Sequence, residues 1–375
     1  MGMRRWTILA WTAFALGMIA LPAASAAQEP FNPPTKAAHN STPQHLALIR
    51  EGIAFHNKGD FDAALVRYYS VLNEDPDDLL AMYESALALT GKKDYAKALE
   101  FAVRGAEYKS DRIGEFYTAI GNVYVLLKQP EVAIKAFQYG LELAPADALL
   151  HYNLSVSYAE QKRFPEALKS VKTAAVLRPD HPGSHQNLAV LFAQQGYPVP
   201  ALFAAARVLT LDQQTQRSQI ALAVLNSILR ERPAQAGSAG AVPIPSTKKD
   251  EGDFAAQESL IAAGRPRRSL EEAQAKPEIR LLAEQMSGLF AATADQMKSA
   301  PPSSFTYQYY APYFVEMKQR DLVEPFVYYI FQRTGMPGVA EWLKDNGERV
   351  KAFQAWSTQF QWAKQVDGVE VGARK

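Results

Sequence analysis

The sequence predicts an all-α protein in which a helical solenoid is followed by a small separate helical domain. Small side chains recur every 34 or 35 residues through the first half, in two independent ladders. A period of this length is typical of stacked helix pairs. The second half has apolar stripes at helical spacing without that period. The first ladder is Gly52, Ala86, Gly121, Ser155 and Ala189, and the second is Ala64, Ala98, Ala133, Ala167 and Ala201.

The N-terminus is typical of a secretory signal peptide over residues 1–26. Two arginines precede the apolar run Trp6 to Leu21, and the small residues Ala24-Ser25-Ala26 follow as a cleavage site. The apolar run is shorter than the ~20 residues that span a bilayer comfortably. We therefore expect a mature chain that begins at Ala27, has no integral membrane span, and is periplasmic or secreted.

Residues 27–44 are rich in proline and poor in apolar side chains, so we expect an N-terminal tether. From His45 a bulky ladder lies three residues after the first small one, on the same helical face. Small residues at that spacing allow two antiparallel helices to cross closely, and the bulky residues fill the space beside them. The bulky ladder is Phe55, Leu89, Tyr124, Tyr158 and Phe192.

These motifs resemble the tetratricopeptide repeat family from His45 to Thr215. The run Tyr152-Asn153-Leu154-Ser155 is similar to the first-helix motif of that family. The segment from Gly59 through Ala64 is similar to the turn into the second helix, and the segment from Leu141 through Pro145 is similar to the end of the second helix. The resemblance implies five repeats. A stripe of Ile220, Ala223, Val224, Ser227 and Ile228 predicts a capping helix, so the solenoid is expected to span residues 45–232.

A flexible linker is expected at residues 233–268, because eleven of the fourteen residues from Pro233 to Ser246 are Ala, Gly, Pro or Ser. A helical C-terminal domain is expected at 269–366, followed by a tail at 367–375. One predicted helical stripe is Ile279, Leu282, Met286, Leu289 and Phe290, and another is Val350, Phe353, Trp356, Phe360 and Ala363. The aromatic stretch from Tyr307 to Phe331 is interpreted as core, with an interface as the alternative.

Composition excludes several classes of function. A net charge of +1 provides no field for nucleic acid or anionic lipid, and the absence of cysteine excludes thiolate chemistry. No catalytic motif is present, so we expect no enzyme activity, no catalytic residues, no metal and no cofactor. His151 and His185, 34 residues apart, are interpreted as packing residues, and the pair Asp77-Asp78 as solvated.

The resemblance places the functional surface on the first helix of each repeat, where it lines a concave groove. Ile49 and Ile53 stand where carboxylate-binding family members carry Lys and Asn, so a carboxylate clamp is not expected. An extended peptide or helix suits a groove that is apolar at one end and amide-rich at the other. The predicted groove residues are Ile49, Ile53, Tyr83, Leu87, Thr118, Asn122, Tyr152, Asn153, Val156, Gln186, Asn187 and Val190.

The leading hypothesis is an exported adaptor or scaffold that binds a protein or peptide partner in this groove, within a cell-envelope assembly. The groove holding the protein's own linker or C-terminal domain is a competing interpretation. A first alternative function is an enzyme using Glu316, Asp321, Glu324 and Glu341 of the C-terminal domain. A second is carbohydrate binding through Trp342, Trp356 and Trp362.

Export is directly testable. Mass spectrometry of the protein from the producing cells should show a chain that starts at Ala27 or within a residue or two of it, because the small residues before it suit signal peptidase. The protein should be in the periplasm or the medium. Recovery of the full-length chain from the cytosol would contradict the predicted signal.

Overall fold

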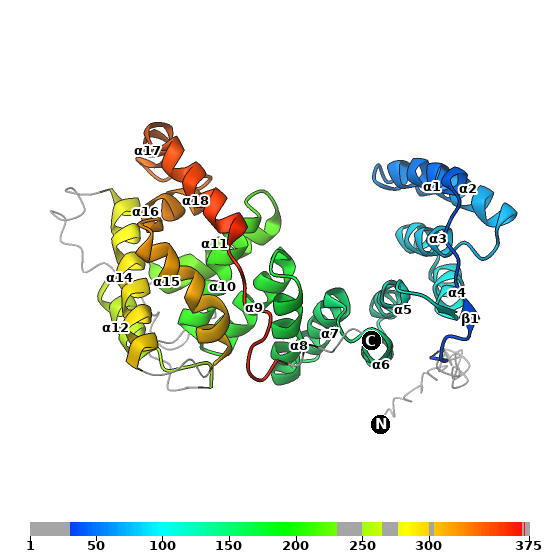
Figure 1. The fold of residues 1–375 in the computed structure, drawn as a ribbon, viewed down its shortest axis with the longest axis horizontal. Helices are drawn as coiled ribbons and strands as arrows, with labels where there is room; N and C mark the ends of the chain where they lie inside the picture. Colours follow the sequence, from blue (N-terminus) through cyan, green and yellow to red (C-terminus); the bar gives the residue numbers. More distant parts are fainter. Residues whose placement is uncertain (1–30, 231–249, 265–276, 300–303, 370, 372–375) are drawn as a thin grey trace, which may run out of the picture. The chain divides into compact units, whose positions relative to one another are not determined.

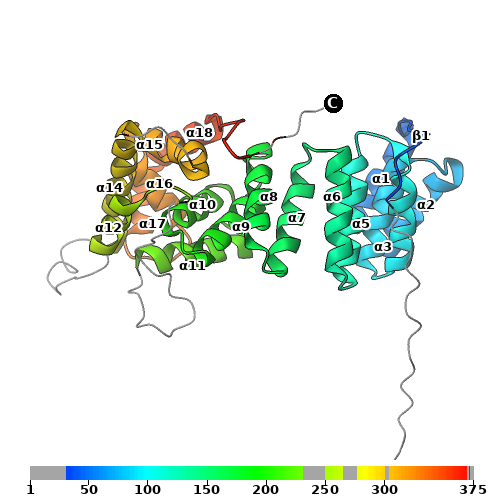
Figure 2. The same cartoon turned by 90° about the horizontal axis from the view of Figure 1, so that it is seen from below.

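The structure is a computed structural model that describes residues 31–230, 250–264, 277–299, 304–369 and 371. The predicted signal at 1–26, much of the predicted linker and most of the tail lie outside these residues. The first part of the chain forms five antiparallel helix pairs (Figures 1 and 2). The pairs are α1 (Pro43–His56) with α2 (Phe61–Glu74), α3 (Leu79–Gly91) with α4 (Tyr95–Gly105), α5 (Ile113–Leu126) with α6 (Pro130–Leu143), α7 (Ala148–Glu160) with α8 (Phe164–Leu177), and α9 (Pro182–Gln194) with α10 (Pro198–Leu211).

Each pair packs through the two ladders of small residues. The second-ladder alanines, from Ala64 to Ala201, are all 0% exposed. In the first ladder, a Cβ atom added to Gly52 would lie 2.3 Å from the ring of Tyr68, and one added to Gly121 would lie 2.2 Å from Phe137. An aromatic ring of the second helix therefore rests on the backbone of the first. The predicted close crossing is confirmed.

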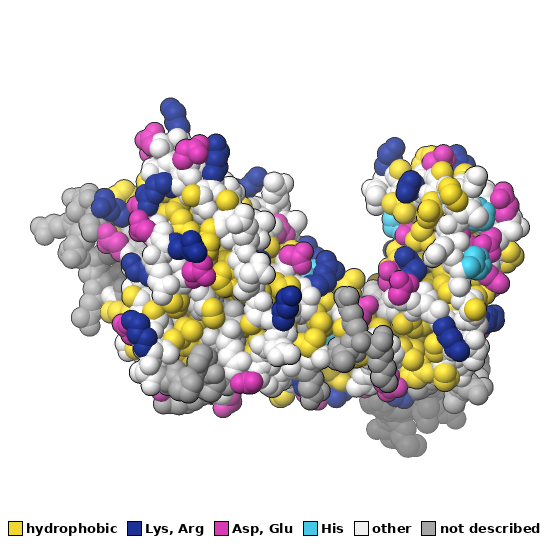
Figure 3. Space-filling view, in the orientation of Figure 1, with side chains coloured by type: hydrophobic (Ala, Val, Ile, Leu, Met, Phe, Trp, Pro, Cys, Tyr) yellow, Lys and Arg dark blue, Asp and Glu magenta, His cyan; other side chains and the backbone are white. Residues whose placement is uncertain are grey.

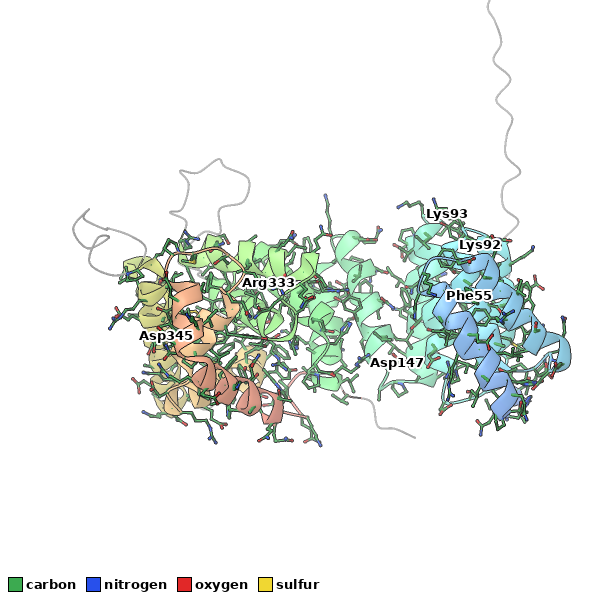
Figure 4. All side chains as sticks on the ribbon, turned by 90° about the horizontal axis from the view of Figure 1, so that it is seen from above. Phe55, Lys92, Lys93, Asp147, Arg333 and Asp345 are labelled. Atoms are coloured by element: carbon green, nitrogen blue, oxygen red, sulfur yellow. The ribbon has the colours of Figure 1, made fainter. Side chains whose placement is uncertain are left out.

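The turn inside each pair repeats one backbone geometry. A residue two or three positions after the end of the first helix has positive φ in every pair, and the next backbone N–H bonds back to the bulky-ladder carbonyl, as Asp94 does to Leu89 at 2.9 Å. This is the Schellman arrangement, which favours glycine. Figure 4 labels Lys93 in the second of these turns. The five positions are Gly59, Lys93, Lys128, Lys162 and Gly196.

A capping helix follows the fifth pair, but its buried face differs from the predicted stripe. Helix α11 (Gln216–Leu229) packs on both α9 and α10. Of the predicted stripe only Ile228 is buried, and Ala223 is exposed. Contact with two helices turns a different face inward, and that face is Ser218, Ala221, Leu225, Ile228 and Leu229.

The described residues from Pro34 onward form one compact unit. The C-terminal elements are α12 (Ala255–Gly264), α14 (Glu278–Ser299), the π-helix η1 (Thr306–Tyr310), α15 (Ala311–Gln319), α16 (Val323–Ile330), α17 (Val339–Asp345) and α18 (Gly347–Gln359). The predicted stripe on α14 is confirmed, since all its members are buried. The second predicted stripe is wrong, because Phe353 is its only member buried in α18. Helix α18 ends at Gln359, so Phe360 and Ala363 lie outside it, and Val350 and Trp356 are half-buried.

Residues 250–264 differ from the flexible linker expected across 233–268. Phe254 is 4% exposed and stacks on Tyr307 with ring centroids 4.6 Å apart. The Glu251 carboxylate pairs with Lys172 of α8. Ile261 of α12 is fully buried, and α12 contacts α10, α11 and α14. Phe254, Ile261 and the ion pair of Glu251 thus hold this segment on the helices, although the sequence around it is typical of a linker.

The aromatic stretch from Tyr307 to Phe331 is core, as the leading interpretation expected, and it also joins the C-terminal helices to the repeats. The hydroxyl group of Tyr309 donates to the Ala175 carbonyl of α8 at 2.6 Å. The hydroxyl of Tyr310 lies 2.6 Å from Nδ1 of His185 on α9. In Figure 1, η1, α15 and α16 accordingly lie beside the last repeats.

His151 and His185, which are 34 residues apart, make the same hydrogen bond in their repeats. Nε2 of His151 lies 3.0 Å from the Pro145 carbonyl oxygen, and Nε2 of His185 lies 2.9 Å from that of Pro179. Each imidazole thereby satisfies the carbonyl at the end of the preceding repeat. Burial, with a smaller contribution from the nearby Arg207 cation, lowers the pKa of His185 to about 3. Burial also lowers the pKa of His151.

The N-terminal segment is docked rather than free from Thr35 onward, in contrast to the tether expected over 27–44. Strand β1 (Lys36–Ala37) pairs in parallel with β2 (Tyr108–Lys109), which follows α4. Backbone N–H groups of Thr35 and Lys36 both donate to the Glu107 carbonyl. The segment thus closes over the turns of the second repeat. In the described part of the chain, no helix has the length and apolar character needed to cross a membrane.

The turn geometry predicts a stabilising substitution. Lys128 has φ of 61°, where a Cβ atom is crowded and glycine is not. We expect Lys128→Gly to raise the free energy of unfolding by about 0.5–1 kcal/mol. Gly59→Ala, the matched change in the first turn, should lower it by about 1 kcal/mol, and the added methyl group would meet no neighbour within 4 Å. Urea denaturation measures both, and the same sign for both variants would contradict the argument.

The burial of His185 predicts loss of stability in acid. Its pKa is about 3 when folded and 6.5 in the reference state, so only the unfolded chain takes up a proton as pH falls below about 6.5. Protonation of His185 in the unfolded chain should therefore lower the free energy of unfolding by about 2 kcal/mol at pH 5 relative to pH 7. His185→Gln keeps a donor but cannot titrate, so its stability should depend less on pH by that amount. Equal pH slopes in denaturant melts would refute the assignment.

Candidate functional site

The candidate site is the first-helix face, which we define as the face of α1, α3, α5, α7 and α9 that carries the predicted groove residues. Most of these side chains are neither buried nor fully exposed, which suits a surface that a partner would cover. Figure 3 shows acidic, basic and apolar side chains mixed over the repeats. The half-buried members are Ile53, Tyr83, Leu87, Asn122, Tyr152, Asn153, Val156, Gln186, Asn187 and Val190.

Two predicted groove residues are not available to a partner. Ile49 is 1% exposed and belongs to the core of the first repeat, where it packs with Ala64 and Tyr68. Thr118 is 9% exposed, because α5 lies between α3 and α7. The four-residue spacing correctly places these side chains beside Ile53 and Asn122. It does not resolve how far the neighbouring helix covers them.

The amide-rich end of the face is partly occupied by contacts between repeats. Nδ2 of Asn187 donates to Oγ of the buried Ser155 at 2.9 Å, so this amide joins α9 to α7. The ring of Tyr152 meets His181 edge to face, with centroids 4.9 Å apart. Tyr152 and Asn187 are therefore structural as well as accessible. Asn153, Gln186 and Val190 remain half-buried beside them.

An acidic cluster around Tyr83 was missed by the sequence analysis. Tyr83 of α3 packs edge to face with Phe116, with centroids 5.9 Å apart, and the Arg112 guanidinium lies 5.4 Å from its ring centre. Arg112 forms an ion pair with Glu115 at the start of α5. Glu84, next to Tyr83, interacts electrostatically with both Arg112 and Glu115.

Burial shapes the electrostatics of this cluster. It raises the pKa of Glu84 and of Glu115, against the opposing effect of Arg112, and it raises the pKa of Tyr83 to about 12. Asp147 adds negative potential at Glu115 while its Oδ1 caps α7 by accepting from the backbone of Leu149 and Leu150. Figure 4 labels Asp147 at the start of α7.

The cluster is short of positive charge. Among the residues that the structure describes, the Arg112 guanidinium lies near the carboxylates of Glu84 and Glu115, and burial disfavours the ionised form of both. A cation brought by a partner would offset that penalty, so the arrangement suits an ammonium or guanidinium group. The sequence contained the signal, because Glu84 is adjacent to Tyr83 and Glu115 lies one helical turn before Thr118.

Two of the four acidic residues proposed for catalysis in the C-terminal helices are hydrogen-bonded to cations. Glu316 accepts from Nε1 of Trp356 at 2.9 Å and from Arg320 at 2.7 Å, and the Trp356 hydrogen bond is the main cause that lowers its pKa. Glu324 accepts from Arg349 at 2.7 Å. Asp321 and Glu341 are exposed. Glu316 and Glu324 thus tie α15 and α16 to α18 through Trp356 and Arg349.

The three tryptophans proposed for carbohydrate binding are half-buried and engaged in ring contacts. Trp342 stacks on Tyr328 at 4.1 Å, and Trp356 on Tyr313 at 4.8 Å. Trp362 lies against the junction with the repeats, with the Arg207 guanidinium 4.7 Å from its ring centre. Trp362 also stacks on Tyr313, with centroids 5.0 Å apart, so Trp356 and Trp362 share that ring, whereas Trp342 packs elsewhere on Tyr328.

Sequence comparison identifies the repeats. Residues 118–185 match the tetratricopeptide repeat family. A human protein O-mannosyl-transferase is 21% identical over 192 residues, 47% of this chain and 21% of that protein. The small glutamine-rich tetratricopeptide repeat-containing protein 2 of Saccharomyces cerevisiae is 24% identical over 123 residues, 33% of this chain and 36% of that protein. The chain thus spans well under two thirds of the length of either relative.

Several solved structures are similar in part. A tetratricopeptide repeat protein of Thermus thermophilus has 24% identity and a TM-score of 0.43, over 48% of this chain and 98% of that one. MamA of Desulfovibrio magneticus has 18% identity and a TM-score of 0.37, over 47% and 98%. PilW, a type IV pilus biogenesis factor, has 18% identity and a TM-score of 0.41, over 48% and 84%.

Proposed function

We propose that this chain, whose first half is a solenoid of tetratricopeptide repeats, is a non-catalytic scaffold of the cell envelope that holds a segment of a partner protein on its first-helix face. Repeats of this family imply a protein partner. The observation that carries the proposal is the acidic cluster at Tyr83, Glu84 and Glu115, which is half-buried and short of positive charge.

The chemistry of the face selects the kind of partner segment. A lysine or arginine side chain would place its cation between Glu84 and Glu115 and its alkyl stem against Tyr83. Leu87 and Ile53 offer apolar contacts on one side. Asn122, Asn153 and Gln186 offer amides that can bond an extended backbone on the other. A basic, extended segment satisfies all three requirements.

The position of the C-terminal helices supports an external occupant. Their polar contacts with the repeats reach Ala175 and Lys172 of α8, Gln213 after α10, and the buried His185 of α9. Apart from His185, these groups lie on or directly after second helices, whereas the proposed binding residues lie on first helices. Among these polar contacts only the one with His185 reaches a first helix, and His185 is not one of the proposed binding residues, so the competing interpretation, in which the protein's own C-terminal helices fill the groove, gains little support from them.

The proposed location rests on the predicted signal at residues 1–26, followed by Ala27. An exported scaffold would meet its partner in the periplasm or at the cell surface. The C-terminal helices, docked on the last repeats, would then be available for a second partner. This two-partner arrangement is what an adaptor within an envelope assembly requires.

Site-specific photo-crosslinking in the producing cells tests the binding face. A benzophenone amino acid at Leu87, half-buried on α3, should give a discrete adduct with a partner. The same amino acid at Val66, which is 57% exposed on the second helix α2, should not. Adducts from Val66 but not from Leu87 would place the partner on the other face and overturn the proposal.

The charge requirement is tested in the same assay. Glu84→Gln combined with Glu115→Gln should reduce the Leu87 adduct by about tenfold or more, because a paired buried carboxylate at an interface is worth about 1.5–3 kcal/mol. Glu131→Gln, an exposed carboxylate on the second helix α6, is the matched control and should leave the adduct unchanged. An undiminished adduct in the double variant would exclude a basic anchor.

A further inference from the structure

The N-terminal segment meets the first two repeats at a cluster of histidine and aspartate. Pairing of β1 with β2 carries the chain past the α2–α3 turn, and Nε2 of His39 comes within 2.7 Å of Asp75 Oδ2. Ser41 then donates to Asp78 Oδ1 at 3.0 Å. His45 follows on the first turn of α1. In Figure 3, histidine and acidic side chains lie side by side over this end of the repeats.

Two polar groups of this cluster are buried and face each other without a hydrogen bond. His45 is 7% exposed and Asp78 is 0% exposed. Nδ1 of His45 and Oδ2 of Asp78 are 3.4 Å apart, and neither has a hydrogen-bond partner among the described residues. The other oxygen of Asp78 is fully used, because it caps α3 at Ala81 and accepts from Ser41.

The surroundings of His45 indicate which nitrogen is free. Its Nε2 lies 3.4 Å from the Glu74 carboxylate, which favours a proton on that nitrogen. The Nδ1 lone pair then points at an anionic oxygen, so two acceptors oppose each other inside the protein. Leaving such atoms unpaired is costly. A metal-bound histidine typically donates its second N–H to a carboxylate in this way.

We propose that His45, Asp75 and Asp78 bind zinc or a similar divalent transition-metal ion. One ligand atom from each lies within 4.8 Å of the other two. In tetrahedral zinc sites, ligand atoms about 2.0–2.2 Å from the metal are about 3.4 Å from one another, the separation found between His45 and Asp78. Nitrogen with carboxylate oxygen is a donor set that zinc accepts.

His39 orients the Asp75 ligand of this site. Its hydrogen bond to Oδ2 of Asp75, with the Asp77 N–H on Oδ1 at 3.1 Å, fixes the orientation of that carboxylate. A water molecule would supply the fourth ligand of a tetrahedral ion. The three ligands come from α1, the α2–α3 turn and the start of α3. A bound cation would therefore fasten the first repeat to the second where the N-terminal segment crosses them.

Calorimetric titration tests the site on the mature full-length chain, purified without a histidine tag and freed of metal with EDTA. Zinc chloride should bind with about one equivalent per chain and raise the melting temperature. Cobalt(II) should bind at the same place and give the visible absorption of a tetrahedral complex. Magnesium, which prefers six oxygen ligands, should not compete.

The variants separate binding from folding. Asp78→Asn retains a side-chain oxygen for the α3 cap and should lose at least about tenfold in zinc affinity, as should His45→Gln. His56→Gln, on the last turn of α1 and outside the cluster, is the matched control and should bind as the native chain does. Circular dichroism checks that each variant is folded.

The proposal is overturned if the native chain takes up no stoichiometric zinc, which would mean that His45 and Asp78 contact each other directly. It is also overturned if folded Asp78→Asn and His45→Gln bind zinc as tightly as the native chain. If both variants fail to fold, the cobalt spectrum of the native chain decides. An octahedral spectrum, or none, would exclude the site.

Discussion

The close crossing of two helices in each repeat is the constraint on which the rest of this structure depends. The crossing requires alanine at five fully buried positions of the second helix and small residues opposite. At Gly52 and Gly121 an aromatic ring rests directly on the backbone, where even a methyl group would have to displace it. Because every pair crosses alike, every turn repeats one geometry, and first helices always share one face. The candidate binding surface is a consequence of that repetition.

The C-terminal end of the solenoid is closed by chain that is not part of the repeats. At the C-terminal end, α11 and the aromatic helices cover the fifth pair. The junction holds a buried cation, since Arg207 is 5% exposed and donates to the Pro179 carbonyl at 3.1 Å. Its charge is offset by the ring faces of Trp362 and Tyr313. His185 bonds to the same carbonyl and stays neutral, which avoids a second buried charge.

The first-helix face and the N-terminal cluster illustrate one electrostatic principle at different depths. Glu84 and Glu115 are partly buried, and this burial raises their pKa values despite the nearby guanidinium of Arg112, so a further positive charge would stabilise their ionised forms. Asp78 is fully buried, and Nδ1 of His45 faces its carboxylate. A basic side chain suits the first place, since it can enter from solvent. A metal ion suits the second, where the facing nitrogen and oxygen atoms are both buried.

The sequence alone determined the repeat architecture. A 34-residue period in small and bulky residues has few physical solutions, and spacing of one helical turn predicted which side chains of the first helices share a face. Burial depended on neighbours that are distant in sequence. Ile49 and Thr118 share that face but are covered by adjacent helices, and Asp78, interpreted as solvated, is 0% exposed. The docking of residues 250–264 was likewise decided by Lys172 and Tyr307, far away along the chain. Periodicity records which way a side chain points, whereas only the tertiary structure decides what it meets there.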